Sequence, residues 1–285
     1  MLDIKFIREN LQTVKTGLGR RNGNNHDLDT LLKQEDERRQ GLQESEQLKN
    51  KKKKLSAEVG KLKQQGENAS KQMEEVKNLN VLIKELDEKI EGLESIIHEK
   101  LLNIPNLPDE SIPDGQDEFS NRFVREWGKK PSLSTEPLNH VELGEKLDLI
   151  DLKRAAKISG ARFAIYKGAG AALLRGLVNF MVDVQTQENG YEELYPPFLV
   201  NKASMLGTGQ LPKFESDQFE VKLDDEKSRK FLIPTAEVVL TNIVRESFLK
   251  KEELPLRFVA STACFRKEAG SYGKDSKGMI RQHQF

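Results

Sequence analysis

The stretch from Thr262 to Phe285, TACFRKEAGSYGKDSKGMIRQHQF, carries the pattern that decides the fold of this chain. Period-two alternation predicts a strand before its glycine-rich middle and a return strand after it. If the strands pair as a hairpin, one face presents guanidinium, carboxylate, imidazole and aromatic groups, a set that suits a nucleotide. The residues on that face are Cys264, Arg266, Glu268, Arg281, His283 and Phe285. The alternative is a solvent-exposed hairpin held by salt bridges.

The literal sequence around this hairpin adds a more specific indication. The run FRKEAGSYGKDSKGMIRQHQF, residues 265–285, closely resembles motif 2 of the class II aminoacyl-tRNA synthetases, in the version of the seryl-tRNA synthetase family. The likeness extends through the basic loop as well as the Arg-x-Glu core. It implies an α+β protein, with an N-terminal antiparallel coiled-coil arm and a class II antiparallel β-sheet domain flanked by helices.

The resemblance also implies an activity and a set of ligands. The family activates L-serine with ATP and Mg²⁺ and transfers it to tRNA(Ser), so the expected activity is that of a serine–tRNA ligase. Arg266 is the expected catalytic residue, binding the α-phosphate and the serine carboxylate. Glu268 would accept from the adenine amine, Phe285 would stack on adenine and Arg281 would lie near the phosphates. The full expected ATP set is Arg266, Lys267, Glu268, Arg281, Gln282 and Phe285.

Composition bounds the alternatives. Lysine plus arginine equals aspartate plus glutamate, 46 each, so only the distribution of charge can indicate a nucleic-acid partner. The one cysteine, Cys264, excludes an internal disulfide and a thiolate zinc site, and the scattered histidines have no metal-ligand spacing. No apolar run approaches a membrane span or a signal peptide, so the expectation is a soluble cytoplasmic protein with no metal site of its own and no membrane partner.

The first hundred residues predict a helical arm. A short helix is expected over Asp3–Gly17, then long helices over 27–65 and 70–102, with a turn at 65–68 and Ser70 as the N-cap. Spacings of three and four define a heptad seam in the second long helix. Its members are Val76, Leu79, Ile83, Leu86, Ile90, Leu93 and Ile97. Thirty-odd residues per helix give an antiparallel hairpin of roughly 50 Å.

Lysines cluster on the distal half of this arm, where they could attract RNA phosphates. A solvated coiled-coil face is the alternative. The arm resembles the N-terminal domain of the seryl-tRNA synthetase family, which grips the long variable arm of its tRNA, and the loop of motif 2 would meet the acceptor end. The expected tRNA-binding residues are Lys49, Lys51, Lys52, Lys53, Lys54, Lys61, Lys63, Lys274 and Lys277.

The domain boundaries are predicted from a proline-rich stretch and from the point at which helical periodicity ends. The arm is expected over residues 1–104, a proline-rich linker over 105–120 and the catalytic domain, with motifs 1 and 2, over 121–285. Within the catalytic domain we expect a helix over His140–Ile158, a strand over Ala161–Tyr166 and an apolar helix over Ala171–Glu188. This last helix and the strand ELYPPFLV, residues 193–200, resemble motif 1, which forms the homodimer interface in the class.

Two further segments concern the substrate. GTGQLPKF, residues 207–214, resembles a signature loop of the family, and residues 219–223 and 230–234 predict a hairpin around a charged turn. Thr235-Ala236-Glu237 predicts a helix N-terminus with Thr235 as its cap. In the family this segment binds serine, which implies that the carboxylate of Glu237 holds the substrate ammonium.

The chain ends at Phe285, before the position of motif 3, which supplies a second ATP arginine in the family. We therefore expect that this chain, as given, does not make seryl-adenylate. A non-catalytic fragment or paralogue that binds tRNA or dimerises is the rival hypothesis. A plain coiled-coil scaffold leaves the hairpin and substrate motifs unexplained, and the lack of a GxxxxGK[ST] sequence disfavours a P-loop enzyme.

Overall fold

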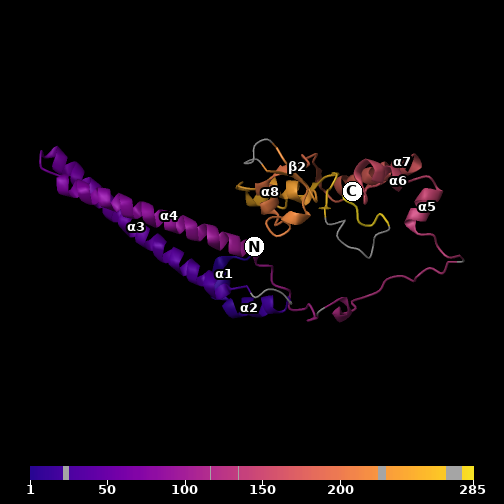
Figure 1. The fold of residues 1–285 in the computed structure, drawn as a ribbon, viewed down its shortest axis with the longest axis horizontal. Helices are drawn as coiled ribbons and strands as arrows, with labels where there is room; N and C mark the ends of the chain where they lie inside the picture. The colour runs from indigo at the N-terminus through magenta and orange to yellow at the C-terminus, as the bar shows by residue number, and fades with distance from the viewer. Residues whose placement is uncertain (22–25, 116, 134, 224–228, 268–277) are drawn as a thin grey trace. The chain divides into compact units, whose positions relative to one another are not determined.

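The computed structural model describes residues 1–21, 26–115, 117–133, 135–223, 229–267 and 278–285. These residues form two compact units, Met1–Glu126 and Trp127–Phe285. Figure 1 shows the elements of each unit: long paired helices in the first, and short helices and strands in the second.

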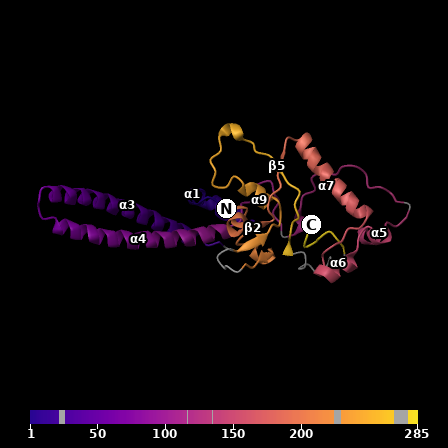
Figure 2. The ribbon, with the colours of Figure 1, turned by 90° about the horizontal axis from the view of Figure 1, so that it is seen from above.

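The first unit is the expected antiparallel arm. After two short helices, α1 (Ile4–Glu9) and α2 (Leu11–Gly19), the long helices α3 (Leu28–Gln64) and α4 (Ser70–Asn103) lie side by side, as Figures 1 and 2 both show. Their 37 and 34 residues correspond to lengths of about 55 and 51 Å at 1.5 Å per residue. The predicted coiled-coil architecture is confirmed.

The fully buried residues of the seam are apolar on α4, whereas those on α3 include polar ones. Leu79, Ile83, Ile90 and Ile97 of the predicted heptad are buried. Facing them, α3 buries Glu35, Gly41 and Ser45 as well as Leu28 and Leu31. A Cβ on Gly41 would lie 3.2 Å from Ile90, so the glycine lets the helices approach closely. Apolar burial therefore concentrates at the base of the arm, where both helices pack on α1 and α2.

Two local predictions for the arm are wrong. Residues 3–17 do not form one helix, because the backbone leaves helical geometry at Asn10 (φ −129°, ψ 38°), whose side-chain amide donates to the Phe6 carbonyl at 3.1 Å. The N-cap of α4 is Ala69, not Ser70. The side chain of Asn68 accepts from the Ser70 amide at 2.9 Å and so binds the first helical N–H from outside the helix.

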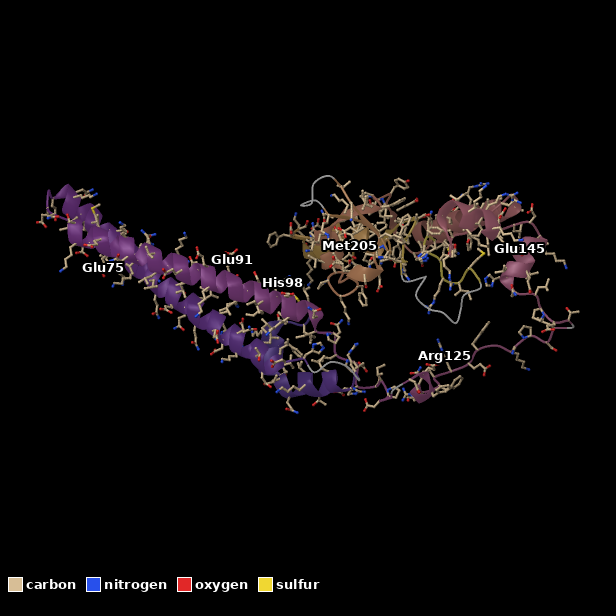
Figure 3. All side chains as sticks on the ribbon, in the orientation of Figure 1. Glu75, Glu91, His98, Arg125, Glu145 and Met205 are labelled. Carbon is tan, nitrogen blue, oxygen red and sulfur yellow. The ribbon has the colours of Figure 1, made fainter. Side chains whose placement is uncertain are left out.

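Part of the proline-rich segment packs on the arm. Leu107 contacts the apolar cluster at the base of the arm. Arg20 donates from Nε to Asp114 at 2.6 Å and from Nη1 to the Asp109 carbonyl at 3.3 Å. Beyond the 3₁₀ turn η1 (Glu118–Ser120), the chain runs extended past Arg125, whose side chain is labelled in Figure 3.

The second unit combines small sheets with short helices. The strands β2 (Leu199–Asn201), β4 (Lys230–Leu232) and β3 (Glu220–Val221) form an antiparallel sheet in the order β2-β4-β3. This confirms the predicted hairpin across residues 219–234. A separate pair, β1 (Glu192–Glu193) and β5 (Phe258–Val259), is parallel, which the expectation of a purely antiparallel sheet did not include.

Short helices pack against the three-stranded sheet. The helices α8 (Lys202–Gly207) and α9 (Glu237–Asn242) contribute Met205, Val238 and Val239 to a core with Phe231 and Ile233. Figure 3 shows side chains crowded around Met205. The unit also contains the 3₁₀ turns η2 (Glu215–Asp217) and η3 (Lys251–Glu253).

The helix predicted over His140–Ile158 is two helices, α5 (His140–Lys146) and α6 (Leu152–Ser159). Between them the chain turns at Asp148 (φ 53°) and returns Ile150 onto Gly144, where a Cβ would lie 2.4 Å from the isoleucine. The strand predicted over Ala161–Tyr166 is reduced to a single bridge between Ile150 and Tyr166. The next helix, α7 (Ala169–Gln187), agrees with the prediction.

Candidate active site

The two predicted strands are reduced to a single antiparallel bridge, between Phe265 and Gln284, with backbone hydrogen bonds on both sides of it. The amide of Cys264 donates to the Phe285 carbonyl at 2.7 Å, and the Phe285 amide donates back to Cys264 at 3.0 Å. One pair further along, the Arg266 amide donates to the His283 carbonyl at 2.9 Å. Directly opposed residues of an antiparallel pair share a face. Cys264, Arg266, His283 and Phe285 therefore lie on one face, as the period-two pattern predicts.

Neighbouring segments hold the hairpin on both edges. The Phe265 amide donates to the Ile233 carbonyl at 2.8 Å, and the Ile233 amide donates to Phe198 at 3.0 Å. On the other edge, the His283 amide donates to the Arg162 carbonyl at 2.9 Å. The first strand thus lies beside the extension of β4, which leads directly into Thr235-Ala236-Glu237.

Among the described residues, two uncharged groups hold the side chain of Arg266. Its Nε donates to the Pro234 carbonyl at 3.2 Å, and its guanidinium carbon lies 5.0 Å from the centre of the Phe285 ring. Neither contact cancels the positive charge, and the planar donor fork suits a phosphate or a carboxylate. The exposed ring of Phe285 beside it can stack on a base. The sequence contains no signal for the role of Pro234, because a backbone carbonyl can be placed only by the fold.

His283 braces the hairpin. Its Nδ1 lies 2.9 Å from the Arg266 carbonyl. Its ring lies 5.4 Å from that of Phe163 and 5.8 Å, edge to face, from that of Phe219. The imidazole is thus engaged by backbone and by aromatic neighbours, although the alternation placed it on the same face as Arg266.

The Thr-Ala-Glu segment lies where the sequence places it, with a different cap. Helix α9 begins at Glu237 and its N-cap is Ala236, so the prediction of Thr235 as the cap is wrong by one residue. Thr235 Oγ1 still accepts from the Glu237 amide at 3.4 Å. The carboxylate of Glu237 is exposed at the helix start, one turn after the carbonyl that holds Arg266.

Sequence reasoning missed Arg229, which ties the segment after GTGQLPKF to the β3–β4 hairpin. Its Nε and Nη2 donate to Glu220 at 2.6 and 2.8 Å, and Nη2 also donates to Glu215. Its guanidinium carbon lies 5.2 Å over the Phe231 ring. The hydrogen bonds that Arg229 donates to Glu220 and then to Glu215 raise the pKa of Arg229, and its hydrogen bonds to Glu220 lower the pKa of that carboxyl. The only signal in the sequence was a charged turn.

The remaining expected ligand residues are exposed, half-buried (Gln282) or outside the described residues. Lys267 and Arg281 are exposed, and Gln282 Nε2 donates to the Met279 carbonyl at 3.0 Å. Glu268, Lys274 and Lys277 lie outside the described residues.

The arm lysines fall into two classes. Lys49 Nζ lies 2.9 Å from Asp87, and Lys51 Nζ lies 2.8 Å from Glu75, whose side chain is labelled in Figure 3, so α4 supplies counter-charges to both. The hydrogen bonds from Lys49 and then Ser45 lower the pKa of Asp87. Within the part of the chain that the structure describes, no acid pairs with Lys52, which is half-buried, or with four further exposed lysines. These four are Lys53, Lys54, Lys61 and Lys63.

Helix α7 presents an apolar face to solvent. Among the described residues, its large exposed side chains are Leu173, Leu174, Leu177, Phe180 and Met181, with exposed fractions of 44–65%. Patches of this kind on a monomer mark interaction surfaces.

Metal clusters and membrane spans are both absent from the described residues. These contain no group of three or more His, Cys, Asp or Glu side chains that could hold a metal ion. None of their helices has the length and apolarity that a membrane span requires.

Comparison with known proteins finds similar sequences along the chain. Residues 1–108 match the family model of the seryl-tRNA synthetase N-terminal domain, and residues 218–285 match that of the tRNA synthetase class II core domain (G, H, P, S and T). All 285 residues align at 50% identity with 66% of a serine–tRNA ligase from Desulfitobacterium hafniense (strain Y51), and at 48% with 66% of one from Syntrophomonas wolfei. The chain thus spans somewhat less than two thirds of these curated relatives.

A solved structure extends the comparison. The seryl-tRNA synthetase from Pyrococcus horikoshii, complexed with ATP, superposes with a TM-score of 0.83 at 34% identity. The superposition covers the whole of this chain and 68% of that one.

Proposed function

The chain belongs to the seryl-tRNA synthetase family, and from that premise we propose that it serves as a serine–tRNA ligase. In this reaction ATP activates L-serine to seryl-adenylate, and the seryl group then passes to the 3′ end of tRNA(Ser). The observation that carries the proposal is the geometry of Arg266, held by the Pro234 carbonyl beside the Phe285 ring and next to Thr235-Ala236-Glu237.

ATP fits the described residues. Arg266 is held in a fixed orientation suited to an α-phosphate, and Phe285 offers a ring face to adenine. We assign four further residues to ATP. Lys267 and Glu268 follow Arg266 in the sequence, and Arg281 and Gln282 belong to the return strand. Mg²⁺ would arrive with the ATP phosphates and neutralise part of their charge. Because the described residues contain no carboxylate cluster for it, no step is assigned to the metal.

Serine would bind between Arg266 and the start of α9. The guanidinium pairs with the serine carboxylate, and the carboxylate of Glu237, with the Thr235 hydroxyl, receives the ammonium. This arrangement places the nucleophilic carboxylate oxygen of serine beside the α-phosphate that the same arginine binds. The bond to the α-phosphorus forms as pyrophosphate leaves, and no protein nucleophile takes part. The protein accelerates the step by positioning and by stabilising charge.

The tRNA would bind along the arm. The exposed lysines of α3 that pair with no acid among the described residues are suited to phosphate contact, which positions an RNA without reading its sequence. The apolar face of α7 is assigned to a second copy of the chain, which would make the protein a homodimer through motif 1.

The decisive experiment is serine-dependent exchange of labelled pyrophosphate into ATP by the purified protein, compared with Arg266→Lys. The same measurement decides between this proposal and the expectation, drawn from the sequence, that the chain as given does not make seryl-adenylate. We expect the lysine variant to lose at least about a hundredfold in exchange rate, because a point charge cannot replace the planar fork. Lys153→Arg, on exposed α6, is the matched control and should leave exchange unchanged. Specific tRNA binding without any exchange would contradict the catalytic proposal and favour the non-catalytic alternative.

A further inference from the structure

We propose that His140 is a positioning residue for ATP, which acts by holding the turn that begins the return strand of the hairpin. The inference rests on the proposed function, since it concerns the same ATP site. His140 is the first residue of α5 and lies far from the hairpin in the sequence.

The imidazole contacts the backbone of the turn directly. The Met279 amide donates to His140 Nε2 at 2.9 Å. A ring nitrogen that accepts is unprotonated, so the neutral ring carries its proton on Nδ1. On its other side Met279 is held through its carbonyl, which accepts from Gln282 Nε2 at 3.0 Å. Both polar groups of the Met279 backbone are therefore engaged, one of them by His140.

The contact between His140 and the turn requires a glycine at position 278. Its φ is +125°, a conformation that residues with a side chain rarely adopt. A Cβ at this position would lie 3.1 Å from both Cε1 and Nε2 of His140. Glycine thus permits the close approach of the ring and the unusual backbone angle together.

The turn borders a cavity on this side. His140, Gly278, Met279 and Gln282 line this cavity of about 530 Å³, which also reaches Arg162. Among the described residues, the backbone of Met279 is held beside the cavity by the hydrogen bonds with His140 and Gln282. The α5 end that carries His140 is itself fixed by a capping box between Asn139 and Glu142.

The position of the turn sets that of the ATP residues after it. Arg281 and Gln282 follow Met279 directly, and the strand continues through His283 to Phe285, which lies against Arg266. Removal of the His140 hydrogen bond should therefore weaken ATP binding while serine binding, which depends on Arg266 and the α9 start, changes little.

The experiment compares His140→Phe, which keeps a ring but has no acceptor, with His140→Gln, whose amide oxygen can accept. His98→Phe, on the arm (Figure 3), is the matched control. We expect His140→Phe to weaken ATP binding by about three- to tenfold by calorimetry, and to speed hydrogen exchange at the Met279 amide. His140→Gln should bind ATP within about twofold of the unmodified protein. Gly278→Ala should resemble His140→Phe.

Unchanged ATP affinity and unchanged Met279 exchange in His140→Phe would overturn the inference. So would equal decreases in affinity in the Phe and Gln variants, because a role in folding alone predicts no rescue by an acceptor. If the unmodified protein binds no ATP, the proposed function fails. Hydrogen exchange at the Met279 amide then tests by itself whether His140 holds the turn.

Discussion

At the scale of single residues, the candidate site uses backbone groups to place side chains that carry charge. The Pro234 carbonyl holds Arg266 Nε, and the Arg266 carbonyl in turn lies 2.9 Å from His283 Nδ1. A carbonyl orients a guanidinium without neutralising it, whereas a carboxylate would compete with an anionic ligand. The arrangement is therefore suited to a site whose ligand must supply the counter-charge.

Glu237 gives the sharpest prediction at this scale. In Glu237→Ala we expect the KM for serine in pyrophosphate exchange to rise by about tenfold or more, since a hydrogen bond to a charged group is removed, while the KM for ATP stays unchanged. Glu188→Ala, an exposed glutamate at the end of α7, is the control. An unchanged KM for serine in the Glu237 variant would contradict a role in serine binding and leave Glu237 as a favourable charge at the start of a helix.

The sequence predicts which of these residues share a face, but not which of them are exposed to a ligand and which are packed against other side chains. Period two correctly places Cys264, Arg266, His283 and Phe285 on one face, because alternation is a property of any strand. It cannot separate His283, which is engaged by the aromatic rings of Phe163 and Phe219, from Phe285, which is exposed. That distinction depends on which segments pack behind the hairpin, and Phe163 lies 120 residues before His283 in the chain.

At the scale of elements, the polar middle of the arm links its stability to pH. Lys49 Nζ lies 2.9 Å from Asp87 and Ser45 Oγ donates to the same carboxylate at 2.7 Å, and these two contacts lower the pKa of Asp87 below its ordinary 3.8. A lowered folded-state pKa contributes stability above the ordinary value, and this contribution is lost as pH falls through the folded-state value.

We therefore expect Asp87→Asn to reduce the acid sensitivity of the arm. Between about pH 5 and about pH 3, the melting temperature followed by circular dichroism at the helical band should fall less in this variant than in the unmodified protein. Glu91→Gln, an exposed acid on the same helix (Figure 3), should behave like the unmodified protein. Equal acid sensitivity in all three proteins would show that this carboxylate does not contribute.

The lysines of the arm give a second prediction for this element. Replacing Lys53 and Lys54 with glutamine should weaken binding of tRNA(Ser) and lower the slope of log K against log salt by about 2, one for each phosphate that the protein no longer neutralises. The matched pair Lys49→Gln and Lys51→Gln should change the slope less, because Asp87 and Glu75 already neutralise these charges. The reverse order, or no change in either slope, would exclude a phosphate role for this face.

The predictability of an element depends on how local its determinants are. The heptads of α4 are a repeated local pattern, and the helix follows them through Asn103. By contrast, the break between α5 and α6 depends on Ile150 returning to Gly144 and on a bridge to Tyr166, contacts that helical periodicity does not encode. The break at Asn10 has a weaker local cause, an amide that competes for the Phe6 carbonyl.

At the scale of the whole molecule, the two units bury their apolar residues separately. The arm concentrates its core at its base, and the second unit concentrates its core around Phe231 and Met205. Between the apolar clusters the chain runs through exposed residues, Phe123 and Trp127 among them. Each unit can thus carry its own binding function, RNA on the arm and nucleotide with amino acid at the hairpin.

The assembly of the protein is the last prediction, and it rests on α7. A single helix that exposes Leu173, Leu177, Phe180 and Met181 along one side carries an apolar surface that water solvates poorly, and a second copy can cover it by the same face through a two-fold axis. A glutamate in the centre of such an interface would be buried without a partner. In Phe180→Glu we therefore expect the dimer dissociation constant to rise by at least about a hundredfold, measured by sedimentation velocity. Phe248→Glu is the control, because Phe248 is fully exposed outside α7 and its replacement should leave the dimer intact. A monomeric unmodified protein at micromolar concentration, or a Phe180→Glu variant that dimerises normally, would assign this face to another partner.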